Sequence, residues 1–477
     1  MATTTPPGTA PGSHRNAGLL VGIAAASIGV IYGYDSSNIG AALKFIAADF
    51  GLGDAGKQAL ATVVVIGEIV GAIAAGWIAN RIGRQRSMVI VAATYCLFAL
   101  FSALAPSNGL LLAARLLLGV TIGISIVVVP VFVAESAPPR ARGAMLVAYQ
   151  VATIVGIIAG YVIGYFLAGH GAWRWMLGVA AIPALAVTLL IMRMPDTPRW
   201  YVSRGRINEA RATLSAIEPG ADVDHEIAEM EQALADESGG GIGEMFRKPW
   251  LRATVFVVGL GFLIQITGIN AVVYYSPKLF EDMGLTGDFG TLMLPAFVQV
   301  AGLAAVITSL LLVDRAGRRP ILLGGIAAMI AATVMLIITY GPLDGSGTAA
   351  HVLGFIGLVV FTMGFSFGFG AMVWVYAGEA FPARLRSYGS SAMLTSDLVA
   401  NAIVAAFTLS LINLIGGAGT FAIFGAFAIV GFVFVYALAP ETKGRKLEDI
   451  QYYWRNGGKW PASTDDTHTD SQPEASR

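Results

Sequence analysis

Residues 80–86 read NRIGRQR, and residues 314–320 read DRAGRRP. Each of these stretches lies between the second and the third hydrophobic stretch of its half of the chain. Residues 134–143 (AESAPPRARG) return in the same way as residues 378–387 (GEAFPARLRS), and a third, looser pair follows the last hydrophobic stretch of each half. Because the motif pairs occur in the same order, the sequence predicts two structurally related halves.

The composition predicts an integral membrane protein. Of the 477 residues, 56% are hydrophobic and 13% are charged, which leaves too little charge to cover a soluble domain. A helix needs about 20 apolar residues to cross the bilayer core. Such windows occur at residues 17–42, 58–79, 87–105, 109–136, 142–168, 173–193, 251–281, 287–313, 320–341, 350–380, 386–413 and 417–438. We therefore expect an all-α membrane protein with twelve transmembrane helices in two pseudo-symmetric six-helix bundles.

The windows and the polar stretches between them divide the chain into five parts. The predicted parts are a disordered N-terminal tail (1–16), an N-terminal six-helix bundle (17–193), a cytoplasmic helical linker (194–250), a C-terminal six-helix bundle (251–439) and a cytoplasmic C-terminal tail (440–477). The linker shows helical periodicity with charged faces, which favours short solvated helices over a catalytic role.

Lysine and arginine gather on one side of the predicted membrane. The opposite side carries only Lys44, Lys57, Arg174 and Lys278. Cytoplasmic loops carry the excess of basic residues, and an even number of spans leaves both termini on one side. We therefore expect a multi-pass protein of the plasma membrane, the inner membrane in a bacterium, with both termini in the cytoplasm.

Several function classes are disfavoured by the residue counts. Thirty basic and thirty acidic residues cancel, so the overall charge gives no indication of nucleic-acid binding. The single cysteine, Cys96, cannot form a disulfide within the chain. The chain has five histidines, and no group of nucleophile, histidine and acid or of metal ligands is recognisable. We expect neither an enzyme nor a metal site.

The motifs resemble those of the sugar porter family of the major facilitator superfamily, over residues 33–450. PDTPRW (195–200) resembles the family signature after the sixth span, PETKGR (440–445) the one after the twelfth, and QITGINAVVYYSP (265–277) the seventh span. The resemblance implies secondary active transport by alternating access, driven by the proton gradient and without a cofactor. The partners implied are a small-molecule substrate, protons and the lipid bilayer, and the protein is expected to be monomeric.

Carboxylates and guanidinium groups of the paired motifs fall at helix ends on one face of the membrane. Such groups form bidentate pairs that hold helices together in one state and separate in another. The predicted gating network consists of Asn80, Arg81, Arg84, Glu135, Arg142, Asp314, Arg315, Arg318, Arg319, Glu379 and Arg386. The alternative is simple anchoring of basic loops. Asn80 stands where the family more often has Asp, so we expect a weaker contact in the N-terminal half.

Asp35 in the first span and Arg115 in the fourth are charges inside apolar helices. Each is costly unless it has a partner or reaches water, so we expect them to pair. Protonation of Asp35 would release Arg115 to another acceptor and let the helices rearrange. In the resembling family, Asp at this position accompanies proton coupling, which makes Asp35 the predicted proton acceptor. The alternative is a permanent structural ion pair.

The resemblance also implies a sugar site between the halves. The residues that carry it are Gln150, Gln265, Asn270, Tyr274, Trp374, Asp397 and Asn401. Sugars offer hydroxyl groups for hydrogen bonds and an apolar face for aromatic rings. Ile157 and Ile264 stand where the family usually has Gln, and Asp397 replaces an amide. A smaller or less hydroxylated ligand is therefore compatible with the site.

Glu68 is a further acid within a span, at a position where the family usually has a small apolar residue. The sequence leaves open whether it faces Arg115, the cavity or another helix. Taken together, the residues predict proton-coupled import of a small polyhydroxylated solute such as a monosaccharide or polyol. The alternatives are a symporter for a small zwitterion or cation that uses Asp397 and Glu68, a proton-coupled exporter, and a sensor with the same fold.

Overall fold

The computed structural model describes residues 15–136, 142–217, 222–237, 242–445 and 447–460. These residues form helices joined by short turns, with no strand among them. Most of the predicted N-terminal tail (1–16) and the end of the C-terminal tail (461–477) lie outside the described residues. Ten of the described helices are long and apolar enough to cross a membrane. With a second span in α17 and the span of α1, the predicted twelve-helix membrane fold is confirmed.

The first bundle is built from the N-terminal helices. They are α1 (Arg15–Phe50), α2 (Asp54–Ile82), α3 (Arg84–Ala103), α4 (Asn108–Ser136), α5 (Arg142–Ala168), α6 (Trp173–Gly178) and α7 (Ala181–Ile191). Inside it α1 packs along α5 and α2 packs along α4. The linker follows, with α8 (Pro198–Ser203), α9 (Ile207–Ile217), α10 (Val223–Glu237) and the short 3-10 helix η1 (Ile242–Glu244).

The second bundle repeats the first, with several of its spans divided into two elements. Its elements are α11 (Leu251–Ile266), α12 (Ile269–Asp282), η2 (Phe289–Met293), α13 (Leu294–Ala316), α14 (Arg318–Tyr340), α15 (Gly347–Phe367), α16 (Phe369–Glu379) and α17 (Ala383–Leu438). A turn at Gly416, with φ 72° and ψ 174°, divides α17 into two spans. A last helix, α18 (Leu447–Arg455), lies in the predicted C-terminal tail.

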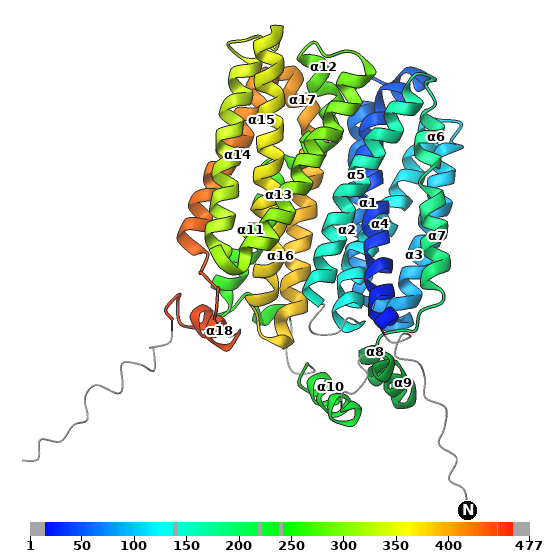
Figure 1. The fold of residues 1–477 in the computed structure, drawn as a ribbon, viewed down its shortest axis with the longest axis vertical. Helices are drawn as coiled ribbons and strands as arrows, with labels where there is room; N and C mark the ends of the chain where they lie inside the picture. The colour runs from blue at the N-terminus through cyan, green and yellow to red at the C-terminus, as the bar shows by residue number, and fades with distance from the viewer. Residues whose placement is uncertain (1–14, 137–141, 218–221, 238–241, 446, 461–477) are drawn as a thin grey trace, which may run out of the picture.

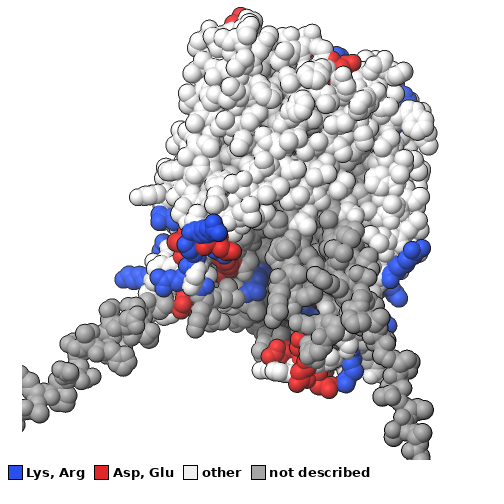
Figure 2. Space-filling model, in the orientation of Figure 1, with Lys and Arg blue, Asp and Glu red and all other residues white. Residues whose placement is uncertain are grey.

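The two bundles stand side by side, and α8, α9, α10 and α18 all lie at the same end of them (Figure 1). We call this the linker end and the other the closed end. Charged side chains gather at the linker end, whereas the visible wall of the bundles is almost free of them (Figure 2). This distribution is expected for a protein whose wall faces lipid.

At the closed end the two bundles share one hydrophobic core. Ile46 and Leu60 of the first bundle belong to the same buried cluster as Tyr275 and Leu409 of the second. Polar contacts cross the interface there as well. Gln58 Nε2 donates to Ser410 Oγ at 2.8 Å, Asn413 Nδ2 donates to Asp54 Oδ2 at 2.8 Å, and the Tyr161 hydroxyl donates to the Val273 carbonyl oxygen. The structure therefore has the bundles joined at this end.

Candidate functional site

A buried ion pair joins two helices of the first bundle. Arg115 Nη1 of α4 lies 2.6 Å from Asp35 Oδ1 of α1, and the side chains are 1% and 6% exposed. The Tyr95 hydroxyl of α3 lies 3.5 Å from the same oxygen. Arg115 Nη2 and Nε have no hydrogen-bond partner among the described residues. The guanidinium group thus has donors left over while its charge is already balanced.

Two more acids lie close to this pair. Glu68 of α2 is 2% exposed, and its Oε2 finds no hydrogen-bond partner in the described part of the chain. It interacts electrostatically with Asp35, Asp397 and Arg115. Asp397 of α17 is 8% exposed and accepts a hydrogen bond from the side chain of Gln265. Glu68 thus interacts electrostatically with Arg115 of the first bundle and with Asp397 of the second.

Five of the predicted sugar-site residues lie on α11, α12 and α17 of the second bundle. Asn270 Nδ2 donates to Asn401 Oδ1 at 2.8 Å, and Asn401 Nδ2 donates to the Tyr274 hydroxyl at 3.2 Å. The bond between Gln265 and Asp397 adds the other two. We call these five residues the amide cluster. Its donors and acceptors match the hydroxyl groups of a polyol in kind.

Gln150 and Trp374 are not hydrogen-bonded to the amide cluster among the described residues. Gln150 on α5 is half-buried. Trp374 on α16 is 43% exposed. Two aromatic residues that were not predicted, Tyr32 and Tyr149, interact electrostatically with Glu68. Tyr149 comes directly before Gln150, but neighbouring residues of a helix point in different directions, so the predicted Gln did not indicate it.

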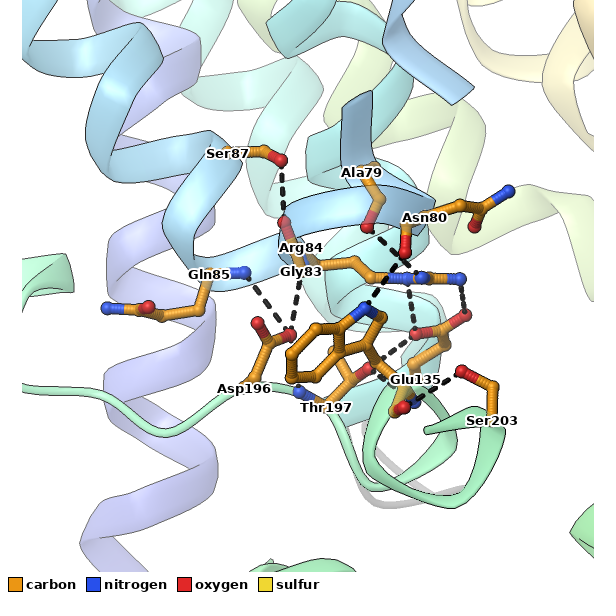
Figure 3. A network of polar contacts seen from close by, with 11 residues as sticks. Ala79, Asn80, Gly83, Arg84, Gln85, Ser87, Glu135, Asp196, Thr197 and Ser203 are labelled. Carbon is orange, nitrogen blue, oxygen red and sulfur yellow. Dashed lines mark hydrogen bonds and ion pairs between the residues drawn. The ribbon is translucent and has the colours of Figure 1, made fainter. Parts of the chain in front are cut away.

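At the linker end of the first bundle, the carboxylate of Glu135 contacts residues from two other segments of the chain (Figure 3). Arg84 Nη2 lies 3.2 Å from Glu135 Oε1, and Arg84 Nε lies 3.1 Å from Glu135 Oε2. Thr197 Oγ1 of the loop before α8 donates to Glu135 Oε2 at 2.6 Å. These contacts tie the start of α3, the end of α4 and the start of the linker into one unit.

Asp196 completes this unit at the start of α3. Its Oδ1 accepts from the backbone N–H of Arg84 at 3.0 Å and of Gln85 at 3.3 Å. Gly83 just before α3 has φ 102°, and a Cβ there would lie 2.0 Å from Asp196 Oδ2. A residue with a side chain would therefore meet both an unfavourable backbone conformation and the carboxylate.

The second bundle repeats this arrangement. Glu441 Oε1 accepts from the backbone N–H of Arg318 and Oε2 from that of Arg319, each at 3.1 Å. Gly317 before α14 has φ 95°, and a Cβ there would lie 2.6 Å from Glu441 Oε2. The repeat is incomplete at the threonine: Thr197 donates to Glu135, whereas Thr442 Oγ1 and Glu379 Oε2 are buried without a hydrogen-bond partner among the described residues. The third motif pair therefore has a structural role that the sequence analysis did not assign.

The other predicted network residues make different contacts. The side chain of Asn80 is exposed, and its backbone oxygen accepts from Trp200 Nε1 at 3.1 Å. Arg81 lies over the ring of Trp77. Asp314 pairs with Arg318 at 3.3 Å but is 84% exposed, and such exposed pairs contribute little.

Three arginines complete the predicted network. The backbone oxygen of Arg315 accepts from Lys443 Nζ at 2.6 Å, Arg319 Nη2 donates to the Tyr436 backbone oxygen at 2.7 Å, and Arg386 Nε has no partner among the described residues. Arg142 lies outside the residues whose side chains are described. The weaker contact expected at Asn80 stays a prediction; Glu135 of the same half makes two short contacts to Arg84.

Two six-helix bundles around buried polar groups are the architecture of the major facilitator fold. The protein therefore belongs to the class of secondary transporters with this fold. The family model described as "Sugar (and other) transporter" matches residues 21–454. The galactose-proton symporter of Escherichia coli strain K12 is 32% identical over 91% of this chain and 94% of its own. The glucose transporter GlcP of Staphylococcus epidermidis is 31% identical over 91% of this chain and 97% of its own.

Solved structures agree on the fold. The proton:xylose symporter XylE bound to 6-bromo-6-deoxy-D-glucose aligns with a TM-score of 0.78 at 24% identity, over 92% of this chain and all of that one. An inward-open structure of XylE from E. coli aligns with a TM-score of 0.77 at 22% identity, over 91% of this chain and 99% of that one. The chain belongs to the sugar porter family of the major facilitator superfamily. It is a multi-pass membrane transporter and not an enzyme.

Proposed function

We propose that the protein imports a monosaccharide or polyol together with protons by alternating access. The observation that carries this proposal is the buried pair of Asp35 and Arg115 in a chain of the sugar porter family. A carboxylate that is removed from water and paired with one base is suited to take up a proton from one side and release it on the other. The galactose-proton symporter among the relatives supports the same reading.

In this mechanism the proton acts on the packing of the first bundle. Ionised Asp35 holds Arg115, and with it α4 against α1. A proton on Asp35 removes the charge that Arg115 balances, so the guanidinium group turns to another acceptor and the two helices can shift. The energy comes from the proton gradient, and no cofactor takes part.

The amide cluster is the proposed sugar site. Asn270 and Asn401 hydrogen-bond each other in this structure, and a sugar hydroxyl can replace either partner because an alcohol both donates and accepts. Gln265 Oε1 has no partner among the described residues. Sugar bound there would hold α11, α12 and α17 in one arrangement, which links occupancy to the position of the second bundle.

The two motif units at the linker end are proposed to set how the bundles move. Arg84, Glu135 and Asp196 brace the first bundle, and Glu441 braces the second in the same way. Each unit described above stays within its own bundle, so each bundle can turn as a body. The basic linker end is proposed to face the cytoplasm of a cell whose plasma membrane holds the protein as a monomer.

The test is uptake into proteoliposomes containing the purified protein. The panel comprises galactose, xylose, glucose, arabinose, sorbitol, glycine, glycine betaine and choline, each with and without an imposed proton gradient. We expect accumulation of at least one sugar or polyol that depends on the gradient. Gradient-driven accumulation of an amino compound and of no sugar would contradict the proposed substrate class, and efflux against the sugar gradient would contradict import.

A symporter for a small zwitterion or cation is the second candidate. The observation that favours it is the position of Asp397, whose carboxyl is hydrogen-bonded to Gln265 within the amide cluster. A carboxylate there could attract an ammonium group. Asp397→Asn separates the two candidates, because it should abolish transport of an ammonium compound but leave a sugar able to bind an amide.

A further inference from the structure

The buried charges in the spans do not balance. Among the described residues, the buried charged side chains within the spans are Asp35, Glu68, Arg115 and Asp397. Arg115 is the single base and is already 2.6 Å from Asp35. Glu68 and Asp397 interact with each other across the two bundles. Two neighbouring carboxylates in a medium of low polarity cannot both stay ionised without a counter-charge.

Glu68 is also the acceptor that Arg115 lacks. Arg115 Nη2 and Nε are without partners among the described residues, and so is Glu68 Oε2. The two groups attract each other electrostatically. The helices that carry these groups, α4 and α2, pack against each other. A hydrogen bond between Arg115 and Glu68 is absent from this state, and we expect it to form in another state, because it would satisfy both groups.

From Glu68 the chain of contacts crosses into the second bundle. α2 and α17, which carry Glu68 and Asp397, pack against each other. Asp397 in turn accepts from Gln265 of the amide cluster. Buried polar side chains thus lead from the first span to the proposed sugar site: Asp35 pairs with Arg115, Glu68 interacts electrostatically with Arg115 and Asp397, and Asp397 interacts with Gln265.

We propose that Glu68 and Asp397 hold one proton between them, and that a proton arriving at Asp35 moves this proton from Glu68 to Asp397. This inference rests on the proposed function and adds a second proton site to it. An O–H bond forms on Asp35, Arg115 turns from Asp35 to Glu68, the O–H bond of Glu68 breaks, and one forms on Asp397. The net charge of the four groups rises from −1 to 0, which is the charge of the added proton.

The transfer changes what the sugar site offers. Ionised Asp397 only accepts hydrogen bonds, and it holds the Gln265 side chain. Neutral Asp397 can donate, and Gln265 Oε1 is a buried acceptor without a partner among the described residues. When the protonated carboxyl of Asp397 donates a hydrogen bond to that oxygen, the Gln265 N–H groups become free to bind a sugar hydroxyl. Proton binding in one bundle thereby prepares the sugar site in the other.

The remaining titratable groups near these acids are tyrosines. Those facing Glu68 are Tyr32 of α1, Tyr149 of α5 and Tyr274 of α12; Tyr32 and Tyr274 also face Asp397, and Tyr34 and Tyr95 face Asp35. Free tyrosine ionises near pH 10, so these hydroxyl groups are neutral donors at physiological pH. They leave the charge count of the four buried groups unchanged.

Infrared difference spectroscopy of the purified full-length protein tests the shared proton without any sugar. At neutral pH the wild type should show the band of a protonated buried carboxyl, which the double variant Glu68→Gln/Asp397→Asn lacks. Asp397→Asn alone should keep the band, because Glu68 then retains the proton. In an Asp35→Asn background, Asp397→Asn should remove it, because Glu68 now ionises beside Arg115. A band that is absent from the wild type, or insensitive to the double variant, would overturn the proposal.

Transport supplies the second readout. Glu68→Gln should lower gradient-driven accumulation by about tenfold, within the range usual for coupling between two sites, and should lower counterflow less. Thr62→Val is the matched control, since Thr62 lies on the same helix and its Oγ1 is also buried without a partner among the described residues; it should transport as the wild type does. Full accumulation by Glu68→Gln would refute the transfer. A wild type without gradient-driven uptake of any panel compound would refute the proposed function instead.

Discussion

Asp196 and Glu441 have the same role in the two bundles, because each accepts hydrogen bonds from the first backbone N–H groups of a helix. Asp196 accepts from the backbone N–H groups of Arg84 and Gln85, and Glu441 accepts from those of Arg318 and Arg319. The first turn of a helix has backbone N–H groups without internal partners and a partial positive charge, which an acid from elsewhere can satisfy. In each bundle that acid comes from the segment after the last span, so the start of α3 or α14 is held by the end of its own bundle.

Asp196 gives the first prediction, a dependence of stability on pH. Burial raises the pKa of the Asp196 carboxyl, and hydrogen bonds from Thr197, Gln85 and Arg84 oppose this shift. Because the pKa is higher in the folded protein, folding is favoured increasingly as the pH falls through the folded pKa toward about 3.9. As the pH is lowered, the melting temperature of the wild type should therefore rise relative to that of Asp196→Asn.

A matched substitution checks that this gain comes from Asp196. Glu231→Gln removes an exposed acid of α10, and its melting temperature should follow the wild type across the same pH range. Asp196→Ala, which removes the acceptor altogether, should cost about 1 kcal/mol. Parallel curves for the wild type and Asp196→Asn would contradict the raised pKa.

The buried ion pair gives the second prediction. Arg115→Met leaves Asp35 buried without its base, which costs about 3–5 kcal/mol in comparable sites. The double variant Asp35→Asn/Arg115→Met should recover most of this loss, because no charge of the pair remains. Thermal unfolding of the detergent-solubilised protein measures both. If the double variant is no more stable than Arg115→Met, the two residues do not interact as the structure has them.

The glycines before α3 and α14 give the third prediction. Gly83→Ala and Gly317→Ala each place a Cβ against a carboxylate in a conformation that other residues avoid, so each should lose about 1–3 kcal/mol. Gly76 lies inside α2 with nothing within 4 Å of a Cβ. Gly76→Ala should therefore leave stability unchanged or raise it by roughly 0.5–1 kcal/mol. Equal effects of all three substitutions would argue against the motif geometry.

The closed end gives the fourth prediction. Gln58 and Ser410 hydrogen-bond each other across the bundles at 2.8 Å, so cysteines at both positions in a Cys96→Ser background should form a disulfide under oxidation. The linked bundles could not separate there, and uptake should stop until a reductant is added. Each single cysteine variant should transport normally under both conditions. Uptake that continues in the cross-linked protein would contradict alternating access at this interface.

Much of the fold was predictable because lipid imposes a simple rule on sequence. Each span needs a run of apolar residues, and the repeated motifs mark where corresponding helices begin and end. The helix breaks were harder to predict. Gly268, with φ 95°, divides α11 from α12, but the predicted span 251–281 continues through it. α18 was missed since the predicted tail has few apolar residues.

The candidate site was predictable only in part. Asp35 and Arg115 stood out as opposite charges in apolar helices, and the structure brings them together. Asp196 and Glu441 lie 112 and 123 residues along the chain from the backbone groups they bind. A local sequence pattern cannot predict a contact between residues so far apart in the chain. The place of Glu68 depends on the rotation of α2 against α4 and α17, which spacing along one helix does not give.

The central claim is that sugar enters with protons through Asp35. The most direct test measures sugar uptake and proton influx together in proteoliposomes of the wild type and of Asp35→Asn, with the best substrate of the panel. We predict that sugar added to the wild type carries protons inward, and that Asp35→Asn still exchanges sugar across the membrane but carries no protons with it. Sugar-dependent proton influx that persists undiminished in Asp35→Asn would contradict the claim.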